Sequence, residues 1–289
     1  MTVLPSDGRR LVAVLAHPDD ESFGPGGTLA LYARRGAEVH LICATRGEVG
    51  DVAPELMHGF ASVGDLREHE LRCAAEHLGL RGVHFLGYRD SGMPGSPDNR
   101  HPQALAANPV EVVAGKVVCL LRQIKPQVVI TFDPIGGYRH PDHIAIQRAT
   151  LEAFLASGDP GRYPECPPAY SPQKLYYHTF SRVFLRLAVR LMPIFGMNPH
   201  KFGRNGDIDL AGIAGEDFPV HARIDFREVS EAKAQASACH ASQGGPPTSG
   251  LLGLFFRLAG GKETFMRAQP AAPPRLSESD LFEDVDVTA

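Results

Sequence analysis

Short apolar runs alternate with segments of helical pattern over the first 180 residues of the chain. The first run, at 11–16, has only apolar residues, as in a strand that is covered on both faces. The runs that predict strands lie at 11–16, 39–44, 83–86, 128–132 and 174–180. The segments that predict helices lie at 28–35, 65–78, 110–123, 141–156 and, after a less regular stretch, 226–242. Strands that alternate with helices require crossover connections, so we predict a doubly wound α/β fold with a mainly parallel sheet.

The same pattern predicts a single α/β domain that extends over the whole chain, 1–289. We expect its core at about 8–180, additions at 181–270, and a proline-rich, then acidic tail at 271–289 that packs poorly. The segment 91–108 is rich in glycine, proline and asparagine, which predicts a loop that could act as a lid.

Composition and charge narrow the class of protein. The 289 residues carry a net charge of -4, which argues against a nucleic-acid partner. No apolar stretch approaches the roughly 18 residues of a membrane span, and the first residues do not resemble a signal peptide. The five cysteines are scattered without a close pair, which indicates reduced thiols, and we expect a cytoplasmic protein.

Titratable side chains gather soon after two of the predicted strands. The first strand is followed by His17-Pro18-Asp19-Asp20-Glu21, and the fourth by His140-Pro141-Asp142-His143. Parallel strands end at the same edge of a sheet, so the two motifs can meet although they are far apart in the chain. Each proline holds the preceding histidine in an extended backbone, which limits where its ring can point.

These residue types suit a metal-dependent hydrolase. Imidazole and carboxylate groups are zinc ligands, and a catalytic zinc uses three protein groups and a water. The seven candidate ligands are His17, Asp19, Asp20, Glu21, His140, Asp142 and His143. A surplus of candidates leaves acid–base groups for hydrolysis, whereas a structural site is closed by four ligands. Either motif alone fits a solvated turn or a helix cap equally well, but both together favour a reaction centre.

A nucleotide-binding Rossmann module is the alternative from a different class of protein. In that case the acidic turn would contact a ribose, and the glycines at 24–27 would form a phosphate-binding loop. The spacing G-x-G-x-x-G is missing, however, so we favour a helix entry beside the metal for these glycines.

The two motifs also resemble those of a known family. "AHPDDE" followed by "GG", together with "GGYRHPDH", is similar to the LmbE-like (PIG-L) family of zinc-dependent N-deacetylases. The further matching segments, which extend the resemblance over residues 11 to about 245, are "TRGEVGD", "LREHEL", "YRDSGM" and "KAQASACHASQ". The resemblance implies a Rossmann-like fold and an activity like that of the N-acetylglucosaminyl deacetylases of the mycothiol and bacillithiol pathways.

The resemblance also implies a metal centre and a base. His17, Asp20 and His143 would bind one zinc ion per chain, with another divalent metal as the alternative. Asp19 would be the general base that takes the proton from the zinc water. A Lewis-acid metal beside a carboxylate base is what amide hydrolysis requires.

Further implied roles concern the amide and the sugar. His140 would stabilise the oxyanion or protonate the departing amine, with Asp142 holding its ring, and Tyr138 would polarise the carbonyl from the facing side. The residues implied to touch the sugar-like part of the substrate are Glu48, Arg67 and Asp90. His240 and Gln243 either line the site or pack within a helix, and the sequence leaves both interpretations open.

Two positions depart from the family pattern. Arg139 adds a charge near the mouth of the site, where many relatives carry a small residue. Cys239 stands where an alanine is common, and we interpret it as a small core thiol.

An amphipathic helix is predicted at 181–191. Its arginines repeat every four residues and therefore share one face: Arg182, Arg186 and Arg190. Contact with an anionic membrane, helped by the apolar stretch at 251–260, is one interpretation. We favour a helix that packs on the core or at a subunit contact, as in a homo-oligomer.

We therefore predict a zinc N-deacetylase that removes acetate from a small N-acetylated amino sugar or its glycoside. The alternative within enzymes is an amidase that cleaves larger thiol or acyl conjugates. The sequence leaves open the aglycone, the metal bound in the cell and the oligomeric state.

Overall fold

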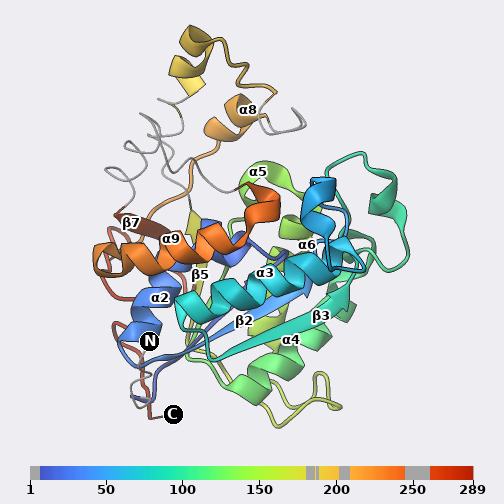
Figure 1. The fold of residues 1–289 in the computed structure, drawn as a ribbon. Helices are drawn as coiled ribbons and strands as arrows, with labels where there is room; N and C mark the ends of the chain where they lie inside the picture. Colours follow the sequence, from blue (N-terminus) through green and yellow to red (C-terminus); the bar gives the residue numbers. More distant parts are fainter. Residues whose placement is uncertain (1–6, 180–185, 187–188, 202–208, 245–260, 289) are drawn as a thin grey trace.

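The chain folds around one sheet (Figure 1). The structure is a computed structural model, and it describes residues 7–179, 186, 189–201, 209–244 and 261–288. Over these residues, seven strands pair in the order β3-β2-β1-β4-β5-β7-β6. The strands are β1 (Arg10–Leu15), β2 (Glu38–Thr45), β3 (Gly82–Tyr88), β4 (Val128–Phe132), β5 (Lys174–Thr179), β6 (Ala222–Asp225) and β7 (Lys262–Gln269). The first five are parallel, and β7 runs antiparallel to both β5 and β6. The predicted α/β fold with a mainly parallel sheet is confirmed.

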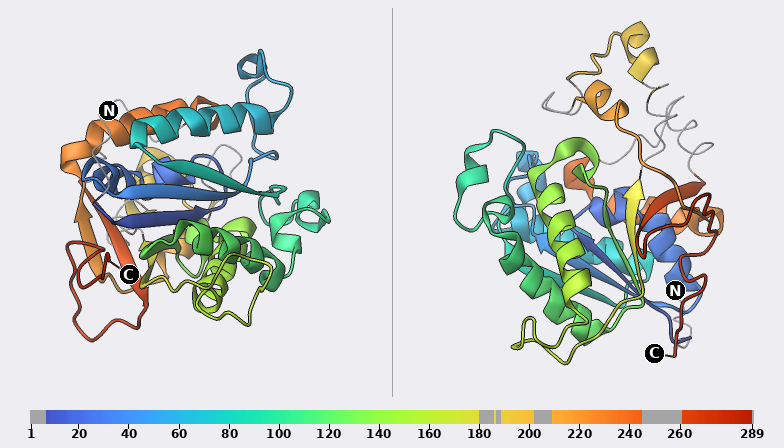
Figure 2. Two further views of the ribbon diagram at one scale, coloured as in Figure 1. Left: turned by 90° about the horizontal axis from the view of Figure 1, so that it is seen from below. Right: turned by 180° about the vertical axis from the view of Figure 1, so that it is seen from behind.

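Helices cover both faces of this sheet (Figure 1). One face carries α2 (Gly26–Arg34), α3 (Val63–Leu78) and α9 (Ser230–Cys239), which pack against one another. The other face carries α4 (Val110–Ile124) and α6 (Pro141–Ala156), and Figure 2 shows the two layers on either side of the sheet. The shorter helical turns are α1 (Asp20–Phe23), η1 (Pro54–Met57), η2 (Pro97–Arg100), η3 (Leu105–Ala107), α5 (Gly136–Arg139), η4 (Met192–Phe195), α8 (Leu210–Ala214), η5 (Arg227–Val229) and η6 (Ala241–Gln243).

The strand β1 forms the centre of the core. It pairs with β2 on one side and β4 on the other, and its residues Leu11 to Val14 have no exposed surface.

The helix α3 illustrates how local chemistry sets the ends of the elements. The Ser62 side chain accepts a hydrogen bond from the Asp65 amide at its start, and Gly79 ends it in the left-handed region. The predicted start at residue 65 was therefore two residues late, because Ser62, not Asp65, caps the helix.

The C-terminal segment is exposed or half-buried at 271–277, and Glu278, Leu281 and Phe282 then anchor it to the core. Leu281 is fully buried and Phe282 is 8% exposed. The Glu278 carboxylate accepts hydrogen bonds from Lys174 Nζ and Tyr176 Oη, each at 2.8 Å. A few anchoring side chains decide the packing of this segment, and its average composition does not reveal them.

Four of the five cysteines form disulfides, so the prediction of reduced thiols is also corrected. Cys73 in α3 is bonded to Cys239 at the end of α9, and Cys119 in α4 is bonded to Cys166. Cys43 is free and buried. The partners are 166 and 47 residues apart, and only the folded structure brings them together.

The predicted amphipathic helix at 181–191 is described only in part. Arg186 donates a hydrogen bond to Asp217 Oδ2 at 2.7 Å, so a protein carboxylate balances its charge. Arg182, the apolar stretch at 251–260 and the last residue of the predicted strand at 174–180 lie outside the described residues. No helix in the described part of the chain is both long and apolar enough to span a membrane.

Candidate functional site

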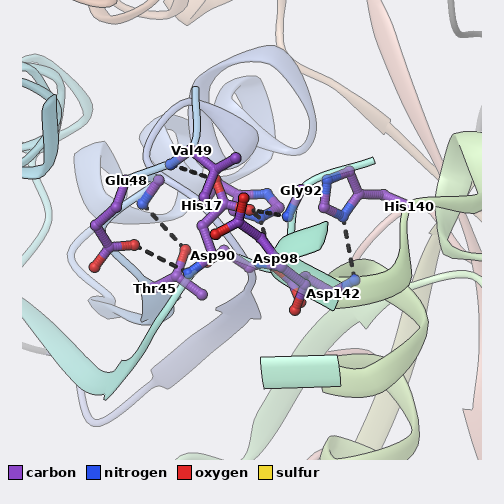
Figure 3. A network of polar contacts seen from close by, with 12 residues as sticks. His17, Thr45, Glu48, Val49, Asp90, Gly92, Asp98, His140 and Asp142 are labelled. Atoms are coloured by element: carbon purple, nitrogen blue, oxygen red, sulfur yellow. Dashed lines mark hydrogen bonds and ion pairs between the residues drawn. The ribbon is translucent and has the colours of Figure 1, made fainter. Parts of the chain in front are cut away.

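Both His-Pro-Asp motifs lie at the carboxyl edge of the sheet, where the strand order reverses between β1 and β4. His17 follows β1, and His140 caps the start of α6 after β4. Asp90 joins them from the end of β3, and all three side chains belong to the network of polar contacts in Figure 3. Ligand sites of doubly wound sheets lie at this point of reversal. The predicted meeting of the two motifs is therefore observed.

The turn after β1 separates the two adjacent aspartates. Asp19 has a φ of 115°, which is rare for a residue with a side chain. Its carbonyl accepts hydrogen bonds from the Ser22 and Phe23 amides, which begin α1. Asp20 Oδ2 accepts from the His17 amide at 2.8 Å, which ties this carboxylate back to the end of the strand.

The side chains of His17, Asp20 and His143 bring two ring nitrogens and the two oxygens of one carboxylate together. His17 Nδ1 lies 3.3 Å from His143 Nε2 and 3.6 Å from Asp20 Oδ2, and His143 Nε2 lies 3.3 Å from Asp20 Oδ1. Zinc ligands at about 2.1 Å from the ion, at the corners of a tetrahedron, lie about 3.4 Å apart. These separations are close to that value, so this donor set of two imidazoles and one carboxylate could bind a metal ion of this size.

The second nitrogen of each of these histidines is held by the protein. His17 Nε2 lies 3.1 Å from Asp142 Oδ2, and His143 Nδ1 lies 3.2 Å from the Gly136 carbonyl oxygen. An ionised carboxylate and a carbonyl oxygen only accept hydrogen bonds, so these two nitrogens carry the protons. The lone pairs of His17 Nδ1 and His143 Nε2 then face the metal position, as in most histidine-ligated metal sites.

His140 is close enough to His17 and His143 to share an ion with them, but its hydrogen bond argues against ligation. Its Nδ1 accepts the Asp142 amide at 3.1 Å, so the proton of the neutral ring lies on Nε2. Burial, followed by the neighbouring His17 and His143, lowers the pKa of His140 to about 2. His140 is therefore a neutral hydrogen-bond donor at the edge of the donor set.

The Asp142 carboxylate does not make the contact expected from the sequence. It was predicted to hold the His140 ring, but the contact between the two residues is made by the Asp142 backbone amide, which donates to the His140 side chain that caps α6. The fully buried carboxylate instead faces His17 and accepts hydrogen bonds from the Ser91 amide, at 2.9 Å, and hydroxyl. Ser91 belongs to the "YRDSGM" segment, and no role was expected for it from the sequence.

Arg67 holds Asp19. Its Nη2 donates to Asp19 Oδ2 at 3.1 Å and to the Pro18 carbonyl at 2.6 Å, and its Nη1 donates to the Gly47 carbonyl at 3.0 Å. Burial, the largest effect, raises the pKa of Asp19 to about 6 although Arg67 lowers it. A pKa near neutrality suits a general base.

Glu48 and Asp90 shape the loops beside the donor set (Figure 3). Glu48 Oε2 accepts the Asp90 amide at 3.0 Å, and the Asp90 carboxylate accepts the amides of Gly92 and Val49 at 2.8 and 3.3 Å. Asp90 Oδ1 also lies 3.5 Å from His17 Nε2. The contacts of Arg67, Glu48 and Asp90 described here are made with the protein itself, and their predicted contact with a sugar stays a prediction.

Tyr138 lies over the donor set. Its ring packs edge-on against His143, with 4.9 Å between the ring centroids, and against His140 at 5.8 Å. Burial raises the pKa of its phenol, so the hydroxyl keeps its proton and can donate a hydrogen bond. Arg139, which departs from the family pattern, follows Tyr138 in the chain. Its side chain is exposed and forms an ion pair with Glu216 at 3.0 Å.

The two residues of the C-terminal motif are placed differently. His240 has no exposed surface, and its Nε2 contacts Glu21 Oε1 at 2.7 Å, so this side chain does not face solvent. Gln243 is partly buried, and its side-chain amide donates to Ser242 Oγ at 3.1 Å. The interpretation of His240 as a packed residue fits better than that of a residue lining an open site.

Comparison with known proteins gives sequence relatives over nearly the whole chain. The profile of the GlcNAc-PI de-N-acetylase (PIG-L) family matches residues 12–154. The 1D-myo-inositol 2-acetamido-2-deoxy-alpha-D-glucopyranoside deacetylase of Geodermatophilus obscurus is 38% identical over 244 residues, which cover 81% of this chain and 83% of the relative. The enzyme of the same name from Thermobifida fusca is 35% identical and covers 95% of this chain and 99% of its own.

Solved structures with the same fold are more distant in sequence. The N,N'-diacetylchitobiose deacetylase of Pyrococcus horikoshii superposes with a TM-score of 0.61 at 21% identity, over 90% of this chain and 83% of the other. GalB, the 4-carboxy-2-hydroxymuconate hydratase of Pseudomonas putida, gives a TM-score of 0.58 at 18% identity, over 93% and 99%. Because a deacetylase and a hydratase share this fold, the structural likeness supports the fold and leaves the chemistry to the site residues.

Proposed function

The chain belongs to the GlcNAc-PI de-N-acetylase (PIG-L) family, and from this premise we propose that it is a zinc-dependent deacetylase of an N-acetylglucosaminyl inositol. The observation that carries the proposal is the donor set of His17, Asp20 and His143 beside the carboxylate of Asp19. The substrate class rests on the relatives, which are deacetylases of a glucosaminide of myo-inositol and match this chain over most of its length.

His17, Asp20 and His143 would hold the zinc ion. A zinc ion held there supplies Lewis acidity for amide hydrolysis. Asp142 and the Gly136 carbonyl orient the two imidazoles, so the ligands are in place before the ion binds.

Asp19 is the proposed general base. It takes a proton from the attacking water and carries it to the departing amine nitrogen. Arg67 fixes the carboxylate through Oδ2, which leaves Oδ1 for the water. A carboxyl with a pKa of about 6 can accept and return a proton near neutral pH.

His140 and Tyr138 are the proposed oxyanion donors. His140 presents an Nε2 proton, because its Nδ1 accepts the Asp142 amide, and Tyr138 presents a protonated hydroxyl. Donors that are already oriented towards a developing negative charge stabilise it more than water does. We therefore assign His140 to the oxyanion and the protonation of the amine to Asp19.

Acetate release tests this function. The zinc-loaded protein is incubated with the N-acetylglucosaminyl inositol, and free acetate and primary amine are measured. We expect both products from the wild type and a loss of about 10²–10⁴-fold in Asp19→Ala, the range that general acid–base catalysis contributes. The proposal fails if the wild type and Asp19→Ala release acetate at the same background rate. A comparison of acetyl with bulky acyl groups on the same glucosaminide separates the deacetylase from an amidase of larger conjugates.

A further inference from the structure

A buried carboxylate contacts the backbone of the base. Glu21 has no exposed surface, and three donors surround it. Its Oε2 accepts the Asp19 backbone amide at 3.0 Å, and its Oε1 accepts the Ser22 hydroxyl at 2.5 Å and lies 2.7 Å from His240 Nε2. Its described contacts include neither the metal-binding atoms nor the Asp19 carboxylate.

The backbone of Asp19 needs such a partner. A residue with a Cβ is seldom found at a φ of 115°, and it stays there only where its surroundings hold it. The Asp19 carbonyl is held by the start of α1 and its carboxylate by Arg67, and the Glu21 carboxylate holds the amide. Loss of the last contact frees the peptide plane that determines where the base points.

The partner of Glu21 comes from the far end of the chain. His240 lies 219 residues away in sequence, at the end of α9, and has no exposed surface. Its Nε2 carries the proton of this contact, because the Glu21 carboxylate can only accept. The next turn is tied to α3, since Glu70 accepts the Ser242 amide at 2.8 Å and its hydroxyl at 2.7 Å. The position of His240 is therefore set by α9 and α3.

We propose that Glu21 and His240 are a positioning pair that holds the backbone of Asp19, and with it the base, in its working orientation. This inference rests on the proposed deacetylase function. Neither residue touches the reacting atoms, and both act through Asp19. The C-terminal helix α9 is thereby part of the active site, although it carries no catalytic residue.

The alternative is that the pair only stabilises the fold. A matched control is available in Glu263, which is also buried and also has three donors: the amides of Gly27 and Thr28 at 2.9 and 2.7 Å, and Lys233 Nζ at 2.5 Å. It caps the start of α2 and has no described contact with Asp19. Both Glu263→Gln and Glu21→Gln remove a buried carboxylate that accepts backbone amides. Only Glu21→Gln affects the hydrogen bond to the amide of Asp19.

The test compares Glu21→Gln with Glu263→Gln. The glutamine side chain at position 21 has one acceptor oxygen and one donor NH₂ group. Its NH₂ group must therefore face either the Asp19 amide or His240 Nε2, both of which are donors, and one of the two hydrogen bonds is lost. We expect kcat to fall about 100-fold, as for a small displacement of a catalytic group, with KM within about 3-fold. Bound zinc per chain should equal that of the wild type, and hydrogen exchange of the Asp19 amide should be faster. Glu263→Gln should lower the urea midpoint comparably while kcat stays near the wild-type value.

His240 gives a second test in case Glu21→Gln fails to fold. His240→Gln keeps a donor near the position of Nε2, and His240→Leu removes it. We expect His240→Gln to retain most of the rate and His240→Leu to lose it as Glu21→Gln does, again with zinc bound.

Two results would overturn the proposal: a kcat of Glu21→Gln within about 3-fold of the wild type, or a loss of zinc in parallel with the rate. A failure of the deacetylase function is recognised separately, because the wild type and Asp19→Ala would then show the same background. The exchange rate of the Asp19 amide still tests the positioning pair in that case.

Discussion

The replacement of Asp142 by asparagine tests which histidine this carboxylate serves. The structure places it against His17, whereas the sequence suggested that it holds the ring of His140. The asparagine keeps the size of the side chain but replaces one acceptor oxygen by a donor. The Asp142 carboxylate accepts from His17 Nε2 at 3.1 Å and from the amide and hydroxyl of Ser91, and it is fully buried. In the variant, at least one of these donors faces another donor, with no solvent to replace the lost hydrogen bond.

The magnitude follows from the role of this carboxylate behind a metal ligand. Changes at such partners weaken metal binding by about 10–100-fold, which corresponds to about 1.4 to 2.7 kcal/mol. We expect the zinc affinity of Asp142→Asn to fall in this range, measured by competition with a chelator of known affinity. The rate at saturating zinc should fall less than the affinity does.

Ser91→Ala is the matched control. It removes the hydroxyl donor but leaves the Asp142 oxygen that faces His17, so the zinc affinity should stay within about 3-fold of the wild type. The reasoning is refuted if Asp142→Asn binds zinc as tightly as the wild type and loses only its rate. That result would return the carboxylate to the role at His140 that the sequence suggested.

Three further predictions concern the support of the site and the fold. In Gly47→Ala, the new Cβ would lie 2.0 Å from Arg67 Nη1, so we expect kcat to fall by about 10-fold or more, whereas Gly59→Ala, also at a positive φ but with no atom within 4 Å, should keep its rate. Leu281→Ala should lower the free energy of unfolding by about 3 kcal/mol in urea denaturation, and a change below about 1 kcal/mol would contradict the burial of Leu281 in the core. Cys73→Ser removes the disulfide to Cys239, which lies 166 residues away in sequence. The free energy of unfolding of the oxidised protein should fall by about 2–5 kcal/mol, and the difference from the wild type should disappear once both proteins are reduced.

The sequence alone predicted the central part of the fold. The apolar runs that became β1, β4 and β5 are buried on both faces or nearly so, and such strands need little beyond their own residues to be recognised. The strands β6 and β7 were missed because β6 has only four residues and β7 has only two buried positions among its eight. Their pairing at the antiparallel edge depends on the core that they complete.

The disulfides and the anchors of the C-terminal segment were beyond sequence reasoning for a similar reason. Cys73 and Cys239 are brought together by the packing of α3 against α9, and their spacing in the sequence does not predict this contact. The tail is polar on average, but Leu281 fills a place in the core that exists only after the sheet and α2 have formed.

The candidate site divides in the same way. Two His-Pro-Asp motifs, the strands before them and the ligand types determined that a metal centre was to be expected at one edge of the sheet. The tertiary structure decided which carboxylate faces which partner: Asp142 faces His17, Arg67 faces Asp19, and Glu21 holds the Asp19 amide with the help of His240. Ligand chemistry is local and can be read along the chain, whereas hydrogen-bond partners depend on directions and distances between segments that meet only in the folded protein.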